Sequence, residues 1–235
     1  MPEVGVVEAA SAMGVCPQRV RAMLADGRVT GRKVAGVWLV DLPSQLDGAL
    51  RPSRRPMSSS QAWRALALLS DIPVQMDPSA RSRLRSRIRS VWDDAGGDRQ
   101  ALGGILRAWF RHRADRQDLF VAPVPFARLA TDARIHVTGV SHAESPIRDA
   151  KMIEAYIRVE DLHQLKRDYA MVAGGAVNVR LHVVSDPVGK QLLKPGQVLL
   201  AAVAADLSEY DDDRSVRAAG QLVERGIGQR TVEGR

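Results

Sequence analysis

Three observations predict an α+β fold for this chain. The first 50 residues contain two short helical patterns followed by a hairpin pattern. The middle of the chain places apolar residues at helical spacing, and the last third alternates strand-like with helical segments. The 235 residues are 45% hydrophobic, which is typical of a globular protein with one to three domains.

The composition divides the chain into four segments. The stretch RPSRRPMSSS at Arg51–Ser60 has no apolar periodicity and indicates a linker. A softer boundary lies at Val121–Pro125, where VAPVP ends any helix before it. We therefore expect an N-terminal domain at 1–50, a linker at 51–60, a basic helical segment at 61–120 and a mixed α/β interaction domain at 121–235.

Membrane insertion, secretion and disulfide bonding are not expected. The longest apolar run, Val198–Ala205, has 8 residues, well below the ~18 of a membrane span. The N-terminus lacks the basic and apolar regions of a signal peptide. Cys16 is the one cysteine, so the chain has no intrachain disulfide and no multi-cysteine zinc site. These features predict a cytoplasmic protein.

The basic residues are concentrated in the middle of the chain. Residues 1–50 and 121–235 each have zero net charge, so the whole excess of +7 lies in 51–120. Such a concentration indicates nucleic acid or an acidic partner protein. The 29 arginines against 5 lysines fit phosphate recognition, but a GC-rich genome would also supply arginine codons.

The N-terminal pattern is that of a helix-turn-helix with a β-hairpin wing. Val7–Met13 predicts a helix, Gly14–Cys16 a tight turn, and Pro17–Ala25 a second helix with proline in its first turn. Val29–Val34 and Val37–Val40 predict the hairpin, with Trp38 packed back on the helices. The residues expected to pack the two helices together are Ala10, Met13, Val15, Val20 and Leu24.

Five side chains of this domain are candidate DNA contacts. Gln18 and Arg19 fall on the outer face near the start of the second helix, the part that reaches base edges in such motifs, and Arg21 flanks them. Arg32 and Lys33 lie on the wing, beside the expected DNA backbone. Because residues 1–50 carry no net positive charge, the basic middle segment would have to contribute to affinity. A helix-turn-helix that contacts protein instead is the alternative.

This stretch, EAASAMGVCPQRVRAMLADGRVTGRKVAGVWLV, resembles the winged helix-turn-helix of the MerR and excisionase families. The resemblance covers about 35 residues and implies sequence-specific binding of double-stranded DNA. Cys16 departs from the family, which usually has Ser or Thr there as the helix cap.

The middle segment predicts three helices, at Ala62–Leu69, Ser79–Trp92 and Asp98–Leu119. The alternating arginines of SARSRLRSRIRSVW could also suggest a strand. A helix aligns Leu84, Ile88 and Trp92 on one side, however, with Asp77-Pro78 as its cap and first turn. A parallel row then holds Arg81, Arg85 and Arg89. This row is interpreted as DNA backbone contact, as contact with an acidic protein or as a solvated face.

The last third predicts a mixed α/β arrangement. The expected strands are Arg134–Val140, Met152–Val159 and Val177–Val184, the last half-buried on one face. Helices are expected at Glu160–Tyr169 and Asp211–Arg225. Val198–Ala205 fits a buried strand or, with four alanines, a helix.

From about Arg55 onward the chain resembles the antitoxins of the abortive-infection E type, which are paired with nucleotidyltransferase toxins. The matching pieces are RPMSSSQAWRALALLS, ARSRLRSRIRS, RAWFRHRA, HVTGVSHA, IEAYIRVEDL, VNVRLHVV and DLSEYDDDRSVRAAGQLVERG. The resemblance implies a protein that represses its own promoter and neutralises a toxin. The N-terminal domain departs from the winged helix common in that family, which leaves the operator geometry and a homodimer on DNA open.

The sequence shows no catalytic grouping, so no enzyme, metal site or cofactor is expected. Its five histidines are dispersed, and His182 is interpreted as structural. The acids Asp211–Asp213 open a helix and are interpreted as cap and dipole partners. The leading hypothesis is a DNA-binding regulator that is also an antitoxin. A MerR-like repressor or excisionase-type protein without a toxin, or a protein-binding adaptor, are the alternatives.

Overall fold

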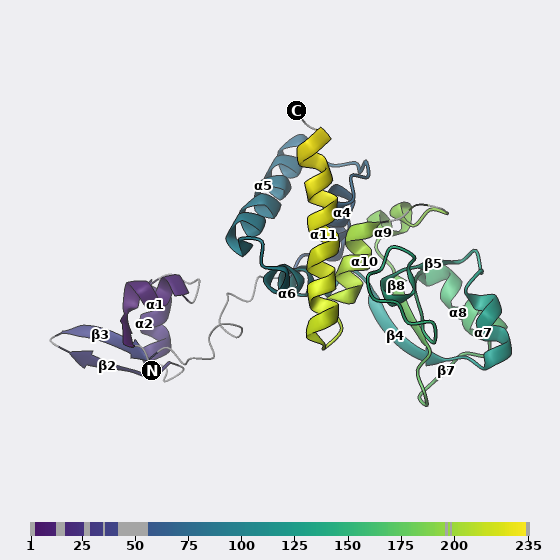
Figure 1. Ribbon diagram of the computed structural model, residues 1–235, viewed down its shortest axis with the longest axis horizontal. Coiled ribbons are helices and arrows are strands. Elements are labelled where there is room, and N and C mark those ends of the chain that lie inside the picture. Colours follow the sequence, from purple (N-terminus) through teal and green to yellow (C-terminus); the bar gives the residue numbers. More distant parts are fainter. Residues whose placement is uncertain are drawn as a thin grey trace. The chain divides into compact units, whose positions relative to one another are not determined.

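The chain folds as α+β, in two compact units, Met1–Arg55 and Pro56–Arg235 (Figure 1). The computed structural model describes residues 3–12, 17–25, 29–34, 36–41, 56–195, 197 and 199–233. The division between the units falls inside the predicted linker 51–60, but Ser59 and Ser60 already belong to the first helix of the second unit. Among the described helices, none has the length and apolar character needed to cross a membrane.

The first unit combines two helices with a three-stranded antiparallel sheet. Its elements are β1 (Glu3–Gly5), α1 (Val6–Ala12), α2 (Pro17–Ala25), β2 (Gly31–Val34) and β3 (Val37–Asp41). The sheet order is β1-β3-β2, so the predicted hairpin is present and its second strand also pairs with β1, which was not predicted. The predicted turn at Gly14–Cys16 lies outside the described residues.

A small apolar core holds the first unit together. Val20 of α2 and Val40 of β3 are fully buried together with Ala9 and Ala10 of α1, and Leu24 and Trp38 pack against them. The predicted packing of Ala10, Val20, Leu24 and Trp38 is therefore confirmed, while Met13 and Val15 lie outside the described residues. Gly31 lets the wing approach α2, because a Cβ atom there would collide with the Leu39 carbonyl and the Leu24 side chain.

The second unit is built on a five-stranded sheet of order β5-β6-β8-β4-β7, in which β6 and β8 are parallel and the other pairs antiparallel. Its strands are β4 (Asp115–Phe120), β5 (Ile135–Val137), β6 (Ile153–Arg158), β7 (Val172–Ala173) and β8 (Val179–Val184). Its helices are α4 (Ser59–Leu69), α5 (Pro78–Ala95), α6 (Arg99–Phe110), α7 (Pro123–Leu129), α8 (Val159–Asp168), α9 (Pro187–Leu192), α10 (Leu200–Leu207), α11 (Asp213–Glu233) and the 3₁₀ turn η1 (Gly139–Ser141).

Helices cover both faces of this sheet (Figure 1). Because strand side chains alternate between faces, Ile153, Ala155 and Ile157 of β6 all point toward α7 and α8, where they pack with Leu129 and Leu165. The opposite face meets a larger helical core, to which α4, α6, α10 and α11 contribute. The polar residues of β6 and β8 point toward this second face, between the sheet and the helices.

The helix caps follow the sequence closely. The Asp77 carboxylate accepts hydrogen bonds from the backbone N–H groups of Ser79 and Ala80, which opens α5 where it was predicted. The Asp77 carboxylate also accepts a hydrogen bond from the Ser79 hydroxyl. This bond contributes most to lowering the pKa of Asp77, and the two backbone N–H groups lower it as well. The helix is thus confirmed and the strand alternative for 79–92 is wrong. Leu84, Ile88 and Trp92 pack against the helical core, as the helical spacing predicts.

Two predictions about the middle segment are wrong. Residues 61–120 are not a separate segment, because α4, α6, α10 and α11 share one core within a single compact unit. The helix predicted at Asp98–Leu119 ends at Phe110, and Asp115–Phe120 is instead strand β4, paired with β8. The apolar positions at helical spacing in fact stop at Trp109 and Phe110, while the backbone of 115–119 finds its partners in the sheet.

The last third also departs from prediction in its details. The strand Val179–Val184 is buried at every residue rather than on one face, because helices cover both sides of the sheet. The segment at Val198–Ala205 is helical, as α10, which was the second of the two interpretations. The predicted strand Arg134–Val140 ends at Val137, where the chain turns into η1. The predicted break at Val121–Pro125 is the start of α7, with Pro123 in its first turn.

Candidate nucleic-acid interface and a buried polar network

The start of α2 presents polar side chains to solvent. Gln18, Arg21 and Ala22 are exposed, whereas Val20 between them is fully buried in the core. The helix begins at Pro17, whose fixed backbone angle and missing N–H suit the first turn. The predicted contact Gln18 and its flanking residue Arg21 are thus solvent-facing. The side chain of Arg19 lies outside the described residues.

The wing carries its two basic residues on opposite faces. Arg32 pairs with Leu39 and Lys33 with Trp38 across the hairpin, and both basic side chains are exposed. Neighbouring residues of a strand point to opposite sides, so Lys33 shares the side of Trp38, which packs on the core, and Arg32 takes the other. A DNA backbone lying along one face of the wing would therefore meet one of these cations directly.

The exposed side of α5 is an arginine-lined groove. The groove has a volume of about 680 Å³ and is lined by Met76, Pro78, Arg81, Ser82, Arg85, Ser86 and Arg89. The predicted row of arginines is therefore brought together on one surface. Arg81 donates to the carbonyl of Val74 at 2.8 Å, while Arg85 and Arg89 are exposed. Over residues 78–92 the helix has no acidic residue to neutralise them.

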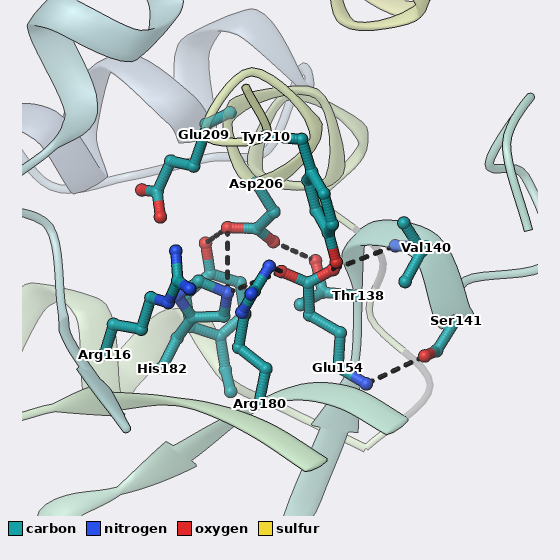
Figure 2. A network of polar contacts seen from close by, with 12 residues as sticks. Arg116, Thr138, Val140, Ser141, Glu154, Arg180, His182, Asp206, Glu209 and Tyr210 are labelled. Atoms are coloured by element: carbon teal, nitrogen blue, oxygen red, sulfur yellow. Dashed lines mark hydrogen bonds and ion pairs between the residues drawn. The ribbon is translucent and has the colours of Figure 1, made fainter. Parts of the chain in front are cut away.

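A second feature, which the sequence did not predict, is a network of buried charges centred on Arg113. Its guanidinium donates to Asp206 and Glu209, to the Tyr156 hydroxyl at 2.6 Å and to the carbonyl of Phe110 at 2.9 Å. Arg113 is 2% exposed and Asp206 is fully buried, so this ion pair is removed from water. Asp206 descends from α10 toward the sheet and also accepts hydrogen bonds from Tyr156 and Thr138 (Figure 2).

Glu154 of β6 is the centre of the sheet side of this network (Figure 2). Its carboxylate accepts hydrogen bonds from His182 at 2.9 Å, from the Val140 N–H at 3.0 Å and from the Tyr210 hydroxyl at 3.0 Å. Burial opposes ionisation of Glu154, but the hydrogen bond and charge of His182 outweigh it, so its pKa is lowered. Gly139 leaves room for this carboxylate, because a Cβ atom there would overlap it.

The network continues toward the surface through Arg180. This side chain donates to Asp118 at 2.9 Å and lies 4.7 Å from the Tyr210 ring centroid. Burial on its own would raise the pKa of Asp118. The hydrogen bonds from Arg116 and Arg180 outweigh burial and lower this pKa to about 2. For Asp206, burial dominates and its pKa is raised, although Arg113 and His182 act in the opposite direction.

The network is satisfied internally, which indicates a structural role. Within the described residues, the buried side-chain atoms without a hydrogen bond are Arg64 Nε, Trp109 Nε1, Arg158 Nε and Gln197 Nε2, none of which belongs to it. A signal was present in the sequence, because Glu154, Arg180 and His182 interrupt otherwise apolar strands and Asp206 interrupts an alanine-rich helix. Buried charges are rare unless they are paired, so such positions predict partners.

The remaining candidates behave as caps and structural groups. The hydroxyl of Ser215, and after it the Ser215 N–H, lower the pKa of Asp212 at the start of α11, and Asp211 pairs with Arg107 on the surface. Among the residues that the structure describes, there is no group of three or more His, Cys, Asp or Glu arranged to hold a metal ion.

The chain matches no protein-family model, and neither the curated proteins nor the solved structures contain a match to it.

Replacing Arg113 with methionine is expected to lower the free energy of unfolding by about 3–5 kcal/mol, because Asp206 would remain buried without its cation. The double variant Arg113→Met/Asp206→Leu should recover part of that loss, since the carboxylate that lost its cation is removed as well. Urea unfolding followed by circular dichroism measures both. Arg107→Met, which breaks an exposed pair on α6, is the control and should change stability little. A single variant as stable as this control would contradict the structural role.

Proposed function

We propose that this chain is a sequence-specific DNA-binding transcriptional regulator and not an enzyme. The observation that carries the proposal is the start of α2, where Gln18 and Arg21 face solvent while Val20 anchors the helix in the core. In helix-turn-helix proteins, the N-terminal residues of the second helix reach base edges in the major groove. The β2–β3 hairpin with exposed Arg32 and Lys33 corresponds to a wing. The resemblance of this stretch to the MerR and excisionase families supports the same assignment.

Affinity for DNA would come largely from the second unit. Residues 1–50 have no net charge, whereas phosphate neutralisation supplies most non-specific affinity. Arg81, Arg85 and Arg89 line one groove on α5, and guanidinium groups match phosphate oxygens well. In this proposal the first unit selects the sequence and the arginine face of α5 binds the phosphate backbone.

We further propose that the regulator acts in the cytoplasm as the antitoxin of a nucleotidyltransferase toxin and represses their shared operon. This part rests on the resemblance of residues 55 onward to abortive-infection E antitoxins. The second unit has a core of its own, to which no residue of α1 or α2 contributes.

Arg19→Ala is expected to weaken binding to the DNA upstream of the gene by ~1–3 kcal/mol if this arginine reads a base. Gln18→Ala and Arg21→Ala test the two neighbouring contacts on the exposed side of α2. Fluorescence anisotropy against upstream and scrambled DNA measures affinity and sequence preference together. Arg128→Ala, at an exposed position of α7, is the control and should leave both unchanged. Wild-type protein that binds scrambled DNA equally well would refute sequence-specific recognition.

Changing Arg81, Arg85 and Arg89 together to glutamine should flatten the salt dependence of DNA binding. Each lost phosphate contact reduces the slope of log K against log salt by about 0.9, so three contacts give a change of about 2.7. The ratio of upstream to scrambled affinity should stay the same, because phosphates carry no sequence information.

The matched control for this triple variant replaces three exposed arginines on other helices, Arg128, Arg167 and Arg214, and so removes the same charge. Equal slopes for the two triple variants would mean that net charge, and not the α5 groove, determines the salt dependence. An unchanged slope accompanied by loss of a protein partner would assign the arginine face to that partner.

Co-expression with the toxin of the same operon should restore growth, and the variant Gln18→Ala/Arg19→Ala/Arg21→Ala should rescue equally well from a foreign promoter. The reason is that neutralisation is assigned to the second unit, which these substitutions do not touch. Growth curves with induced toxin, alone and with each variant, provide the measurement. If well-expressed wild-type chain does not rescue growth, the antitoxin role is refuted and the repressor without a toxin remains.

A further inference from the structure

A pocket of about 520 Å³ opens beside β5, the edge strand of the larger sheet, and lies away from the arginine groove. It is lined by Ala133, Ile135, His136, Val137, Ser141, His142, Ala143, Arg148, Pro195 and Gln197. A second, inner space of about 30 Å³ is lined by Thr138 and Tyr156 among others. His136, Val137, His142 and Gln197 line both spaces, so the two are adjacent. The outer volume lies within the ~300–1,000 Å³ typical of small-molecule sites.

Two of the residues that line this pocket carry donors without an acceptor, whereas the hydroxyls of Ser141, Thr138 and Tyr156 donate to other groups of the protein. No aspartate or glutamate is among the residues that line either space. Arg148 is exposed and makes no ion pair with the carboxylates of the described residues. The Gln197 Nε2 amide is buried and, in the part of the chain that the structure describes, has no hydrogen-bond partner. A guanidinium and an unsatisfied amide among the residues that line one cavity favour a ligand that supplies oxygen acceptors.

His142 adds a donor whose direction the structure fixes. Its Nδ1 accepts the backbone N–H of Glu144 at 3.1 Å, so the proton of the neutral ring is on Nε2. Burial is the largest cause that lowers the pKa of His142, although Glu144 and Asp206 act in the opposite direction. Burial and then the charge of Arg158 likewise lower the pKa of His136, with Asp161 opposing. Both imidazoles are therefore neutral at pH 7, and His142 offers Nε2–H to a ligand.

Most of the remaining wall is apolar. Ile135, Val137, Ala143 and Pro195 surround the outer space, and Leu199, Ala202 and Val203 close the inner one. The inner volume of about 30 Å³ is far smaller than the outer one of about 520 Å³, so the inner space accepts only a small substituent. The body of a ligand must then occupy the outer space, against the aliphatic side chains.

We propose that this pocket binds a small organic anion that combines a compact apolar body with one terminal carboxylate or phosphate. The anionic group is received by Arg148 and the His142 Nε2–H, while the apolar body lies against Ile135 and Val137. A ligand seated there joins three separate segments, because β5, the stretch His142–Arg148 and the stretch before α10 all contribute to the wall. The proposed ligand site does not depend on the proposed DNA binding. All residues that would report ligand binding belong to the second unit.

Three probes of similar size test the proposal: benzoate, phenyl phosphate and uncharged benzamide. Each is titrated into the full chain, and the imidazole ring signals of the five histidines are followed by NMR. We expect benzoate or phenyl phosphate to shift the signals of His136 and His142 saturably, with His112, an exposed residue that lines neither space, as the internal reference. Benzamide should not shift them. Whichever anion binds identifies the terminal group as carboxylate or phosphate.

Two variants keep the test independent of folding. Arg148→Gln removes an exposed charge and should weaken anion binding by about tenfold or more, as the loss of a charged hydrogen bond predicts. Ala143→Phe fills the outer space from an exposed position and should abolish binding. The control Arg214→Gln, on α11, should leave affinity unchanged. The proposal is overturned if neither anion shifts His136 and His142, if benzamide shifts them equally, or if Arg148→Gln binds as tightly as wild type.

Discussion

The ion pair between Arg113 and Asp206 is the interaction on which the larger unit depends. The Arg113 guanidinium reaches α10 through Asp206 and β6 through Tyr156, while its backbone carbonyl accepts from Trp63 Nε1 at 2.9 Å and from Ser59 Oγ at 3.1 Å in α4. One residue between α6 and β4 thus holds the helical layer against the sheet. The middle of the chain is therefore part of the same compact unit as the last third.

The buried network is needed because helices cover both faces of the sheet and one of these faces carries charged side chains. Glu154 and His182 stand on the central strands β6 and β8, and desolvating them costs free energy that only paired hydrogen bonds offset. The helical layer supplies the partners, Asp206 from α10 and Tyr210 from the turn that follows it. Because hydrogen bonds are directional, they fix one register of the helices on the sheet. Apolar contacts alone would specify this register less strictly.

The sequence predicts those features whose cause is local. Asp77-Pro78 and the spacing of Leu84, Ile88 and Trp92 define α5 without reference to the rest of the chain, and the hairpin of β2 and β3 is set by its own turn. The end of α6 was missed because no proline or glycine follows Phe110 closely, and the strand that replaces the helix depends on β8, some 60 residues away. The buried network and the β5 pocket combine residues from distant segments, so only their polar members, misplaced in apolar stretches, give a local signal.

The distribution of charge would affect how a regulator with this arrangement is released from DNA. The exposed start of α2 belongs to a unit without net charge in its first 50 residues, whereas the arginine groove belongs to the other unit. Base contacts and phosphate contacts contribute separately, the first to specificity and the second to affinity and salt dependence. When they reside in different units, any partner that covers α5 would weaken binding to every DNA sequence alike. Such a partner could release the protein from an operator by removing the phosphate contacts alone. The first unit, which would contact the bases, would not have to change.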